Sequence, residues 1–252
     1  DDSGITFVGY ASGFERQGAA DAEKLEEAVA LAKKADTVLL CLGLDELRES
    51  EGLDRSDMKL AENQQQLLAA VAAVNPNVVV LLSAGAPVET PWVGQCRALV
   101  YGALGGQAGA GAAADILTGK LCPCGKLSQT WAQAHDDTPA KANFGGEGRN
   151  VEYREGLYVG YRYYDTAGVP AAFPFGYGLS YTSFAYSDLK ADEKGVTLTV
   201  TNTGSCAGPE VVQLYVAKPD AKNFSSRQGA EGLWQGAAGS RREQDRHHPA
   251  GR

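Results

Sequence analysis

The 252-residue sequence contains no apolar run long enough to cross a bilayer, and the longest run, 78–86, suffices only for a buried strand. Positive charge is also scarce, since the net charge is −8 and the pI is about 5.0. An acidic surface repels phosphate backbones, so we expect no nucleic-acid partner. Because the apolar runs are too short to span a bilayer, we also expect no membrane partner. The first ten residues lack the basic and then apolar pattern of a signal peptide.

The motifs that hold metals and nucleotides are missing as well. The five cysteines are an odd set, in which Cys122 and Cys124 are spaced C-x-C rather than C-x-x-C. The glycines of 102–109 do not have the G-x-G-x-x-G spacing, so a flavodoxin-like nucleotide binder lacks its phosphate-binding loop. We expect no metal and no cofactor. Either the true start lies elsewhere or a leader has been removed. Unpaired cysteines, with no signal peptide seen, slightly favour a cytoplasm-like compartment.

Over residues 1–130 the sequence alternates between helical and strand patterns. Apolar residues at helical spacing predict helices over 22–35 and 61–74, and short apolar runs predict buried strands. The expected strands are 37–42, 78–82, 98–101 and a short fourth strand at 126–128. This repetition is typical of an α/β domain, in which helices sandwich a mostly parallel sheet.

The pattern changes twice after residue 130. Residues 131–183 are rich in glycine, proline and aromatics, which predicts an extended linker with an aromatic hairpin that packs on the α/β domain. The tyrosines of the expected hairpin are Tyr153, Tyr158, Tyr161, Tyr163 and Tyr164. From residue 184 onward, apolar residues and Thr alternate, with a turn at 202–204. We therefore expect a truncated all-β sandwich over 184–227.

The last segment, 228–252, fits neither domain. Only Leu233 and Trp234 are large and apolar, so it is not expected to supply the strands that the sandwich lacks. A disordered tail is one interpretation, and a frameshift is the other. Read one base forward, the codons of 228–235 can encode Arg-Glu-Leu-Arg-Gly-Phe-Gly-Lys, and those of 243–251 can encode Ser-Lys-Thr-Val-Thr-Ile-Pro-Leu-Asp. Both shifted strings have a strand pattern, which favours the frameshift.

Several strings between about residues 20 and 226 together resemble glycoside hydrolase family 3, the family of many β-glucosidases. The strings at 153–165 and 173–182 are the most specific, and any one of the shorter strings alone would be weak evidence for the family. The strings are ESEGLDR at 49–55, NPNVVVL at 75–81, GAPV at 85–88, GGQAG at 105–109, ADILTG at 114–119, PCGKL at 123–127, YREGLYVGYRYYD at 153–165 and FPFGYGLSYT at 173–182.

The resemblance implies a fold, a reaction and a partner. The all-β segment is implied to be fibronectin type III-like. The implied reaction releases a terminal β-linked glucose with retention, from a β-glucoside or a short oligosaccharide. The catalytic nucleophile is implied to lie in a separate (β/α)8 barrel, either in the same protein or in a separate chain. This chain alone is then expected to be inactive.

The candidate carboxylates lie in 45–57, which follows the carboxyl end of the expected strand 37–42, where ligands gather in open α/β sheets. A retaining glycosidase needs two carboxylates about 5 Å apart, a nucleophile and an acid/base. By resemblance, Glu51 matches the acid/base glutamate of the motif E-G-x-D-R. Glu49 is the fallback carboxylate, and the two side chains would point the same way in an extended loop.

Three neighbours are expected to support Glu51. Gly52 lets the chain turn tightly, and Asp54 and Arg55 could hold the loop through a charge-assisted contact. The loop could equally be an ordinary solvated acidic loop.

The tyrosines could stack on a sugar, although packing at a domain interface is favoured. A non-catalytic carbohydrate-binding or scaffold module is the alternative for the whole chain.

Overall fold

The computed structural model describes residues 4–146, 148–193, 195–216, 229–238 and 243–249. The chain divides into two compact units. The first comprises Asp1–Ala113 and Gln133–His135, and the second comprises Ala114–Ala132 and Asp136–Arg252. The division thus lies closer to residue 113 than to residue 130, where the sequence patterns change.

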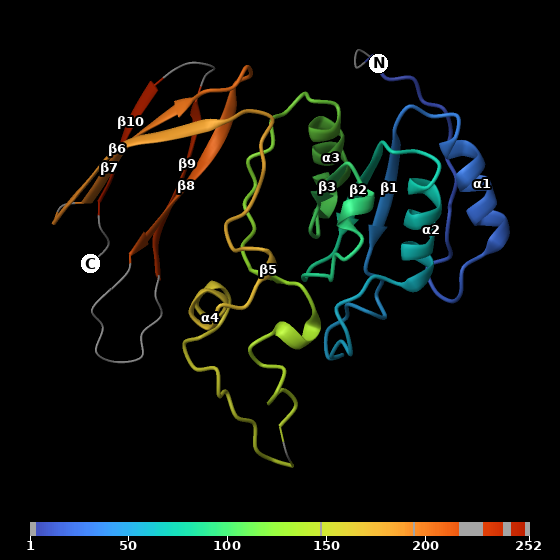
Figure 1. Cartoon of the computed structure of the whole chain (residues 1–252), viewed down its shortest axis with the longest axis horizontal. Helices are drawn as coiled ribbons and strands as arrows, with labels where there is room; N and C mark the ends of the chain where they lie inside the picture. The colour runs from blue at the N-terminus through green and yellow to red at the C-terminus, as the bar shows by residue number, and fades with distance from the viewer. Residues whose placement is uncertain (1–3, 147, 194, 217–228, 239–242, 250–252) are drawn as a thin grey trace. The chain divides into compact units, whose positions relative to one another are not determined.

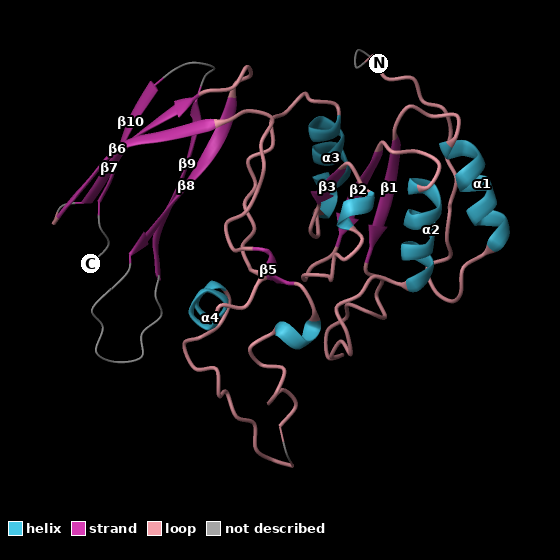
Figure 2. Cartoon of the chain, in the orientation of Figure 1, coloured by secondary structure: helices cyan, strands magenta, loops and turns pink. Residues whose placement is uncertain are grey.

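The first unit is built around a three-stranded parallel sheet of order β1-β2-β3 (Figure 1, Figure 2). Short 3-10 helices cover Val93–Gln95, Gly106–Ala108 and His135–Asp137. The regular elements up to the unit boundary are α1 (Ala22–Ala32), β1 (Val38–Gly43), α2 (Glu62–Ala72), β2 (Val78–Ser83), β3 (Ala98–Tyr101) and α3 (Gly109–Leu117), which crosses that boundary. The predicted α/β fold with a parallel sheet is confirmed.

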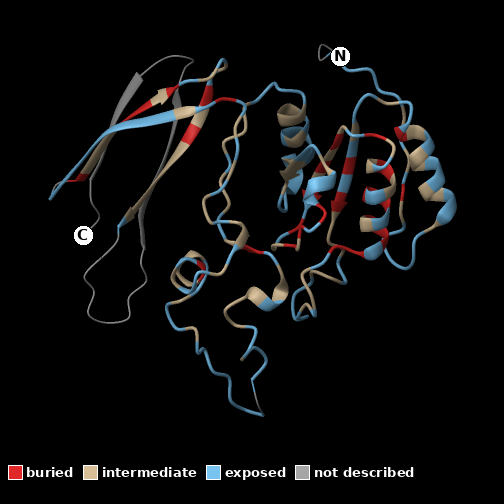
Figure 3. Cartoon of the chain, in the orientation of Figure 1, coloured by how far each residue is buried: buried red, intermediate tan, exposed pale blue. Residues whose placement is uncertain are grey.

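The core of this unit is formed mainly by β2 and α2 (Figure 3). Alternate residues of β2 are buried, while those between them are half-buried, as the two-residue period of a strand requires. On α2, the buried apolar residues recur at helical spacing and share one face. The fully buried side chains of the two elements include Leu68, Val71, Val78, Val80 and Leu82.

Side chains cap both ends of α1. Asp21 Oδ1 accepts a hydrogen bond from the backbone N–H of Lys24 at 3.1 Å, which satisfies a free donor of the first turn. At the other end, the buried Asn75 donates through Nδ2 to the carbonyls of Ala32 at 3.0 Å and Ala35 at 2.7 Å. Asn75 lies in the turn after α2, so the segment predicted to stop α2 also ties α1 to it.

The three parallel strands end at one edge of the sheet, and Gly43 fixes that edge. A Cβ on Gly43 would lie 2.2 Å from the carbonyl oxygen of Ser83, so only glycine fits at the end of β1. The buried Gln64 of α2 accepts a hydrogen bond from the Gly43 N–H at 2.9 Å and donates to its carbonyl at 2.8 Å. The loop that follows β1 therefore starts from a point held by both β2 and α2.

The second unit contains antiparallel strands in sheets of order β10-β7-β6, β8-β9 and β4-β5. Its elements are β4 (Trp131–Ala132), α4 (Tyr161–Ala167), β5 (Ala171–Phe173), β6 (Phe184–Asp192), β7 (Gly195–Asn202), β8 (Gly208–Val216), β9 (Gly229–Ala238) and β10 (Glu243–Pro249). Antiparallel strands after residue 184 are confirmed. Their assignment as a fibronectin type III-like sandwich stays a prediction.

The tyrosine-rich stretch forms no hairpin: its later part is a helix, and Tyr153 and Tyr158 lie in the irregular segment before that helix. Tyr161, Tyr163 and Tyr164 lie in α4. Gly160 and Gly168 flank the helix with φ values of +53° and +68°, which glycine adopts without steric cost. The two glycines thus set the limits of a one-turn to two-turn helix inside a segment that has few other helix signals.

Two further stretches differ from their predictions. Residues 126–128 form no strand, because Leu127 exchanges backbone hydrogen bonds of 2.8 Å with Gly176 and Tyr177, which lie in a turn rather than in a strand. Within 228–252, where we expected no strands, β9 pairs with β8 and β10 pairs with β7. Backbone pairing does not depend on particular side chains. The frameshift stays a prediction.

A buried carboxylate joins β8 to β6 in the second unit. Glu210 is 8% exposed, and its Oε1 accepts a hydrogen bond from the Tyr186 hydroxyl at 3.0 Å. Lys126 Nζ lies 3.4 Å from the same oxygen and also donates to the Gly178 carbonyl at 2.7 Å. Burial of the hydroxyl, and then the charge of Glu210 and the hydrogen bond to it, raise the pKa of Tyr186.

Gly43→Ala should lower the free energy of unfolding by about 2 kcal/mol or more, because the new methyl group would overlap a backbone oxygen that cannot rotate away. Gly94→Ala is the matched control, since a Cβ at Gly94 would meet no atom within 4 Å. Urea unfolding followed by far-UV circular dichroism checks this. Equal midpoints for the two variants would contradict it.

Stability should fall as the pH rises above 10, the ordinary pKa of tyrosine, because folded Tyr186 keeps its proton where the unfolded chain loses it. Below pH 10 the contribution of Tyr186 to the free energy of unfolding is fully present. Tyr186→Phe should be less stable at pH 7, since Glu210 loses a donor, but should decline less between pH 10 and pH 11. Urea midpoints across this range measure both effects, and parallel declines in the two proteins would refute the assignment.

Candidate functional site

The loop after β1, residues 44–57, leaves the carboxyl edge of the sheet as two successive turns (Figure 1). In the first turn, Asp45 Oδ1 accepts two backbone N–H groups at 3.0 Å each. In the second, the N–H of Leu53 donates to the carbonyl of Ser50 at 3.3 Å. The loop is therefore not extended, so the condition under which Glu49 and Glu51 would point the same way is not met, and the two residues lie in different surroundings.

Glu51 and Gly52 are the two central residues of the second turn. Gly52 has φ +78°, the value that the third residue of a type II turn requires. A Cβ on Gly52 would meet no atom within 4 Å, so backbone geometry rather than crowding selects glycine. Glu51 is exposed and makes no hydrogen bond or ion pair with any residue in the described ranges. Its carboxyl group is free to meet a ligand.

Glu49 makes one of the long-range contacts of this loop. Its Oε2 accepts a hydrogen bond of 2.8 Å from the backbone N–H of Gly85, in the loop that follows β2. The side chain is half-buried, and its negative charge helps to raise the pKa of Tyr101, after the larger effect of burial. The two carboxylates predicted from the sequence thus divide into one that is anchored and one that is free.

Arg55 also ties the loop to the segment after β2. Its Nη1 donates to the Pro87 carbonyl at 3.1 Å, while Nη2 is buried without a hydrogen-bond partner among the described residues. Burial lowers the pKa of Arg55, and the charges of Glu49 and Asp57 partly oppose that shift. Asp54 is exposed and forms no ion pair in the described part of the chain, so the expected contact between Asp54 and Arg55 is not made.

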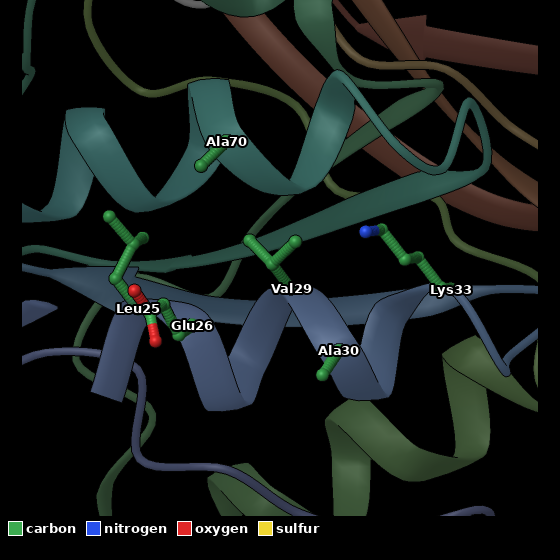
Figure 4. Close-up of a pocket in the computed structure, with 6 residues that line it drawn as sticks. All are labelled: Leu25, Glu26, Val29, Ala30, Lys33 and Ala70. Carbon is green, nitrogen blue, oxygen red and sulfur yellow. The ribbon is translucent and has the colours of Figure 1, made fainter. Parts of the chain in front are cut away.

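The pocket drawn in Figure 4 lies between α1 and α2 and is lined mainly by apolar side chains. Leu25, Val29 and Ala70 lie at the packing surface of the two helices, and Glu26 and Lys33 are its charged residues. Neither charged group belongs to the loops at the carboxyl edge. The pocket is thus a gap in helix packing, and the polar groups that could act on a ligand are found on loop 44–57 instead.

Neither a metal-binding cluster nor a membrane-spanning helix is found in the described part of the chain. Among them, no group of three or more His, Cys, Asp or Glu side chains is placed to hold a metal ion. None of the helices in the described ranges has both the length and the apolar content to cross a membrane. Burial raises the pKa of Cys41 and Cys96, which disfavours their thiolates.

Sequence reasoning found Glu49, Glu51, Gly52 and Arg55 but did not find the partners that hold Glu49 and Arg55. Gly85 lies in one of the strings that carry the family resemblance, yet its sequence context gives no sign that its N–H meets a carboxylate 36 positions away. Contacts between loops leave no periodic trace in a sequence, because they depend on how strands align.

Comparisons with known proteins agree with this architecture. The model of the glycosyl hydrolase family 3 C-terminal domain matches residues 6–181. Thermostable beta-glucosidase B of Acetivibrio thermocellus is 47% identical over 204 residues, covering 78% of this chain and 27% of that protein. An exo-alpha-(1->6)-L-arabinopyranosidase of Bifidobacterium breve is 44% identical over 204 residues, covering 79% of this chain and 27% of that protein.

A solved structure is similar over almost the whole chain. The GH3 beta-glucosidase of Bifidobacterium adolescentis has a TM-score of 0.92 and 40% identity, covering 96% of this chain and 37% of that one. The chain spans about a quarter of the length of the curated relatives that it matches. Because the family model covers more than half of its residues, the chain belongs to glycosyl hydrolase family 3 and carries the C-terminal domain of that family.

Proposed function

We propose that this chain is part of a retaining β-glucosidase and that Glu51 is its acid/base residue. The observation that carries the proposal is the free carboxyl group of Glu51, presented by a glycine-dependent turn at the carboxyl edge of a parallel sheet. The nucleophile is assigned to a (β/α)8 barrel outside these 252 residues. The similarity to β-glucosidases supports both assignments.

The proposed reaction has two steps. In the first, the nucleophile attacks the anomeric carbon while Glu51 gives its proton to the glycosidic oxygen, so that the leaving group departs as an alcohol. In the second, the Glu51 carboxylate takes a proton from water, and the resulting oxygen displaces the enzyme carboxylate from the sugar. Two displacements at one carbon retain its configuration, and Glu51 is protonated again at the end, with a proton taken from water in place of the one given to the leaving group.

The neighbours of Glu51 are given supporting roles. Gly52 supplies the backbone geometry that presents the carboxyl group, and Arg55 fixes the far side of the turn through the Pro87 carbonyl. Asp54, exposed beside the turn, is available for a contact with the barrel or the substrate. The proposed domains are an α/β domain over 1–130, a linker over 131–183 and a partial fibronectin type III-like sandwich over 184–227.

The proposed substrate is a β-glucoside or a short oligosaccharide with a terminal β-linked glucose. Related proteins act on more than one pyranose, since both glucosidases and an arabinopyranosidase align with this chain at similar identity. The choice of sugar is therefore assigned to residues of the barrel rather than to Glu51, whose proton transfer to the glycosidic oxygen is common to such substrates.

Glu51→Ala, in this chain completed by a barrel domain, should lower kcat/KM for phenyl β-glucoside by about 10²–10⁴-fold, because a poor leaving group needs general acid catalysis. The loss should be much smaller for 2,4-dinitrophenyl β-glucoside, which leaves without a proton. Added azide should then restore turnover and give β-glucosyl azide, since an anion needs no base. Product analysis and initial rates with both substrates measure these effects.

Glu27→Ala is the matched control, because Glu27 is an exposed glutamate of the same unit on α1. Equal rates for the Glu51→Ala and Glu27→Ala variants would overturn the assignment of Glu51. If the completed chain binds glucosides but never hydrolyses them, the alternative of a non-catalytic carbohydrate-binding module is favoured. Hydrolysis by the 252-residue chain alone would show that the nucleophile lies within it.

A further inference from the structure

The carboxylate of Glu49 occupies a site between the loops that follow β1 and β2. Its Oε2 accepts the Gly85 N–H at 2.8 Å, and a Cβ built on Gly85 would lie only 2.8 Å from its Oε1. That Cβ would also lie 3.0 Å from Leu104 Cδ1, in the loop that follows β3. Glycine at position 85 thus leaves the space that the carboxylate fills, at a point where three loops meet.

The peptide group that binds Glu49 is held from both sides. Its carbonyl belongs to Ala84 and accepts a hydrogen bond of 2.8 Å from the Tyr101 hydroxyl, while its N–H belongs to Gly85 and donates to Glu49. A peptide group that donates and accepts at once is polarised, so each hydrogen bond strengthens the other. The carboxylate of Glu49 is therefore anchored to a backbone group whose own position is fixed by the end of β3.

Glu49 is also linked to the turn that presents Glu51. Only Ser50 separates the two glutamates, and Ser50 is the first residue of that turn, because its carbonyl accepts the Leu53 N–H. The other described anchor of this turn to a neighbouring loop is the bond from Arg55 to Pro87, which lies beyond it in sequence. Release of Glu49 would leave the turn held on one side only.

We infer that Glu49 is a positioning residue, whose carboxylate holds the Glu51 turn in place through the backbone N–H of Gly85. This inference rests on the proposed role of Glu51 as acid/base. Glu49 does not touch the reacting atoms in this account, and it needs an acceptor oxygen rather than a transferable proton. A displacement of about 1 Å at a catalytic group can cost about 10²-fold in rate, so the anchor has a measurable effect.

Four variants separate this role from others in the completed enzyme. Glu49→Ala removes the acceptor. Gly85→Ala keeps Glu49 but places a methyl group in the space that its carboxylate occupies. Both should lower kcat/KM for phenyl β-glucoside by about 10–100-fold, with little loss for 2,4-dinitrophenyl β-glucoside. Glu49→Gln keeps an acceptor oxygen and should stay within about threefold of the unmodified enzyme. Glu46→Ala, on the same loop, is the charge-removal control, because exposed Glu46 pairs only with exposed Arg16 among the described residues.

A purely structural defect would lower the rates for both substrates equally, and that result would overturn the inference. So would normal activity of Glu49→Ala and Gly85→Ala. If Glu49→Gln were as poor as Glu49→Ala and azide rescued both, Glu49 would be the acid itself. A failure of the proposed function is seen separately, as normal activity in Glu51→Ala.

The anchor can also be tested in the 252-residue chain without any activity. In ¹⁵N-labelled protein, the Gly85 amide proton should shift upfield and exchange faster in Glu49→Ala, while Glu49→Gln and Glu46→Ala should leave it nearly unchanged. An unchanged Gly85 resonance in Glu49→Ala would overturn the inference whatever the role of Glu51.

Discussion

The parallel register of β1 and β2 brings Gly43 against the carbonyl oxygen of Ser83, with no room for a side chain between them. Because parallel strands end at the same edge, this contact places the loops after β1 and β2 side by side. The distance from Glu49 to Gly85, and the attachment of Arg55 to Pro87, are consequences of that alignment. A shift of the register by one residue would separate these partners and turn the buried face of the shifted strand outward.

The loops at this edge are fixed by side chains that bind backbone groups rather than by apolar burial. Gln64 binds both polar groups of Gly43, Glu49 binds the N–H of Gly85 and Arg55 binds the carbonyl of Pro87. Each contact satisfies a backbone group that a loop would otherwise leave to water. A loop held in this way can keep a charged residue such as Glu51 exposed and still have a defined shape.

The sequence predicted the parts of the fold that depend on local patterns. Apolar runs located β1, β2 and β3 to within about two residues, and helical spacing located α1 and α2, because buried faces repeat with a fixed period. It failed at α4, where the tyrosines form no apolar stripe and flanking glycines set the helix limits. Gly52 indicated a tight turn, but the directions of the neighbouring Glu49 and Glu51 side chains stayed open, since the same acidic residues suit an extended loop and a tight turn equally well.

In the candidate site, too, the residues were predictable from the sequence but their contacts were not. Glu51 and Glu49 were found because carboxylates follow the end of a predicted strand, and a family motif favoured Glu51. What distinguishes the two residues is a hydrogen bond to Gly85, and that contact depends on the alignment of two strands rather than on any spacing in the sequence. The role proposed for Glu49 therefore depends on a contact seen only in the fold, while the role proposed for Glu51 was already indicated by the family motif.

The central claim is that this chain supplies an acid/base residue and not the nucleophile of a retaining enzyme. It is tested most directly by treating the chain, completed by a barrel domain, with a 2-deoxy-2-fluoro-β-glucosyl fluoride, which leaves the sugar attached to the nucleophile. Peptide mapping by mass spectrometry then locates the attached sugar. The account predicts a labelled carboxylate in the barrel and none within residues 1–252. A sugar attached to Glu49, Glu51 or any other residue of this chain would contradict it.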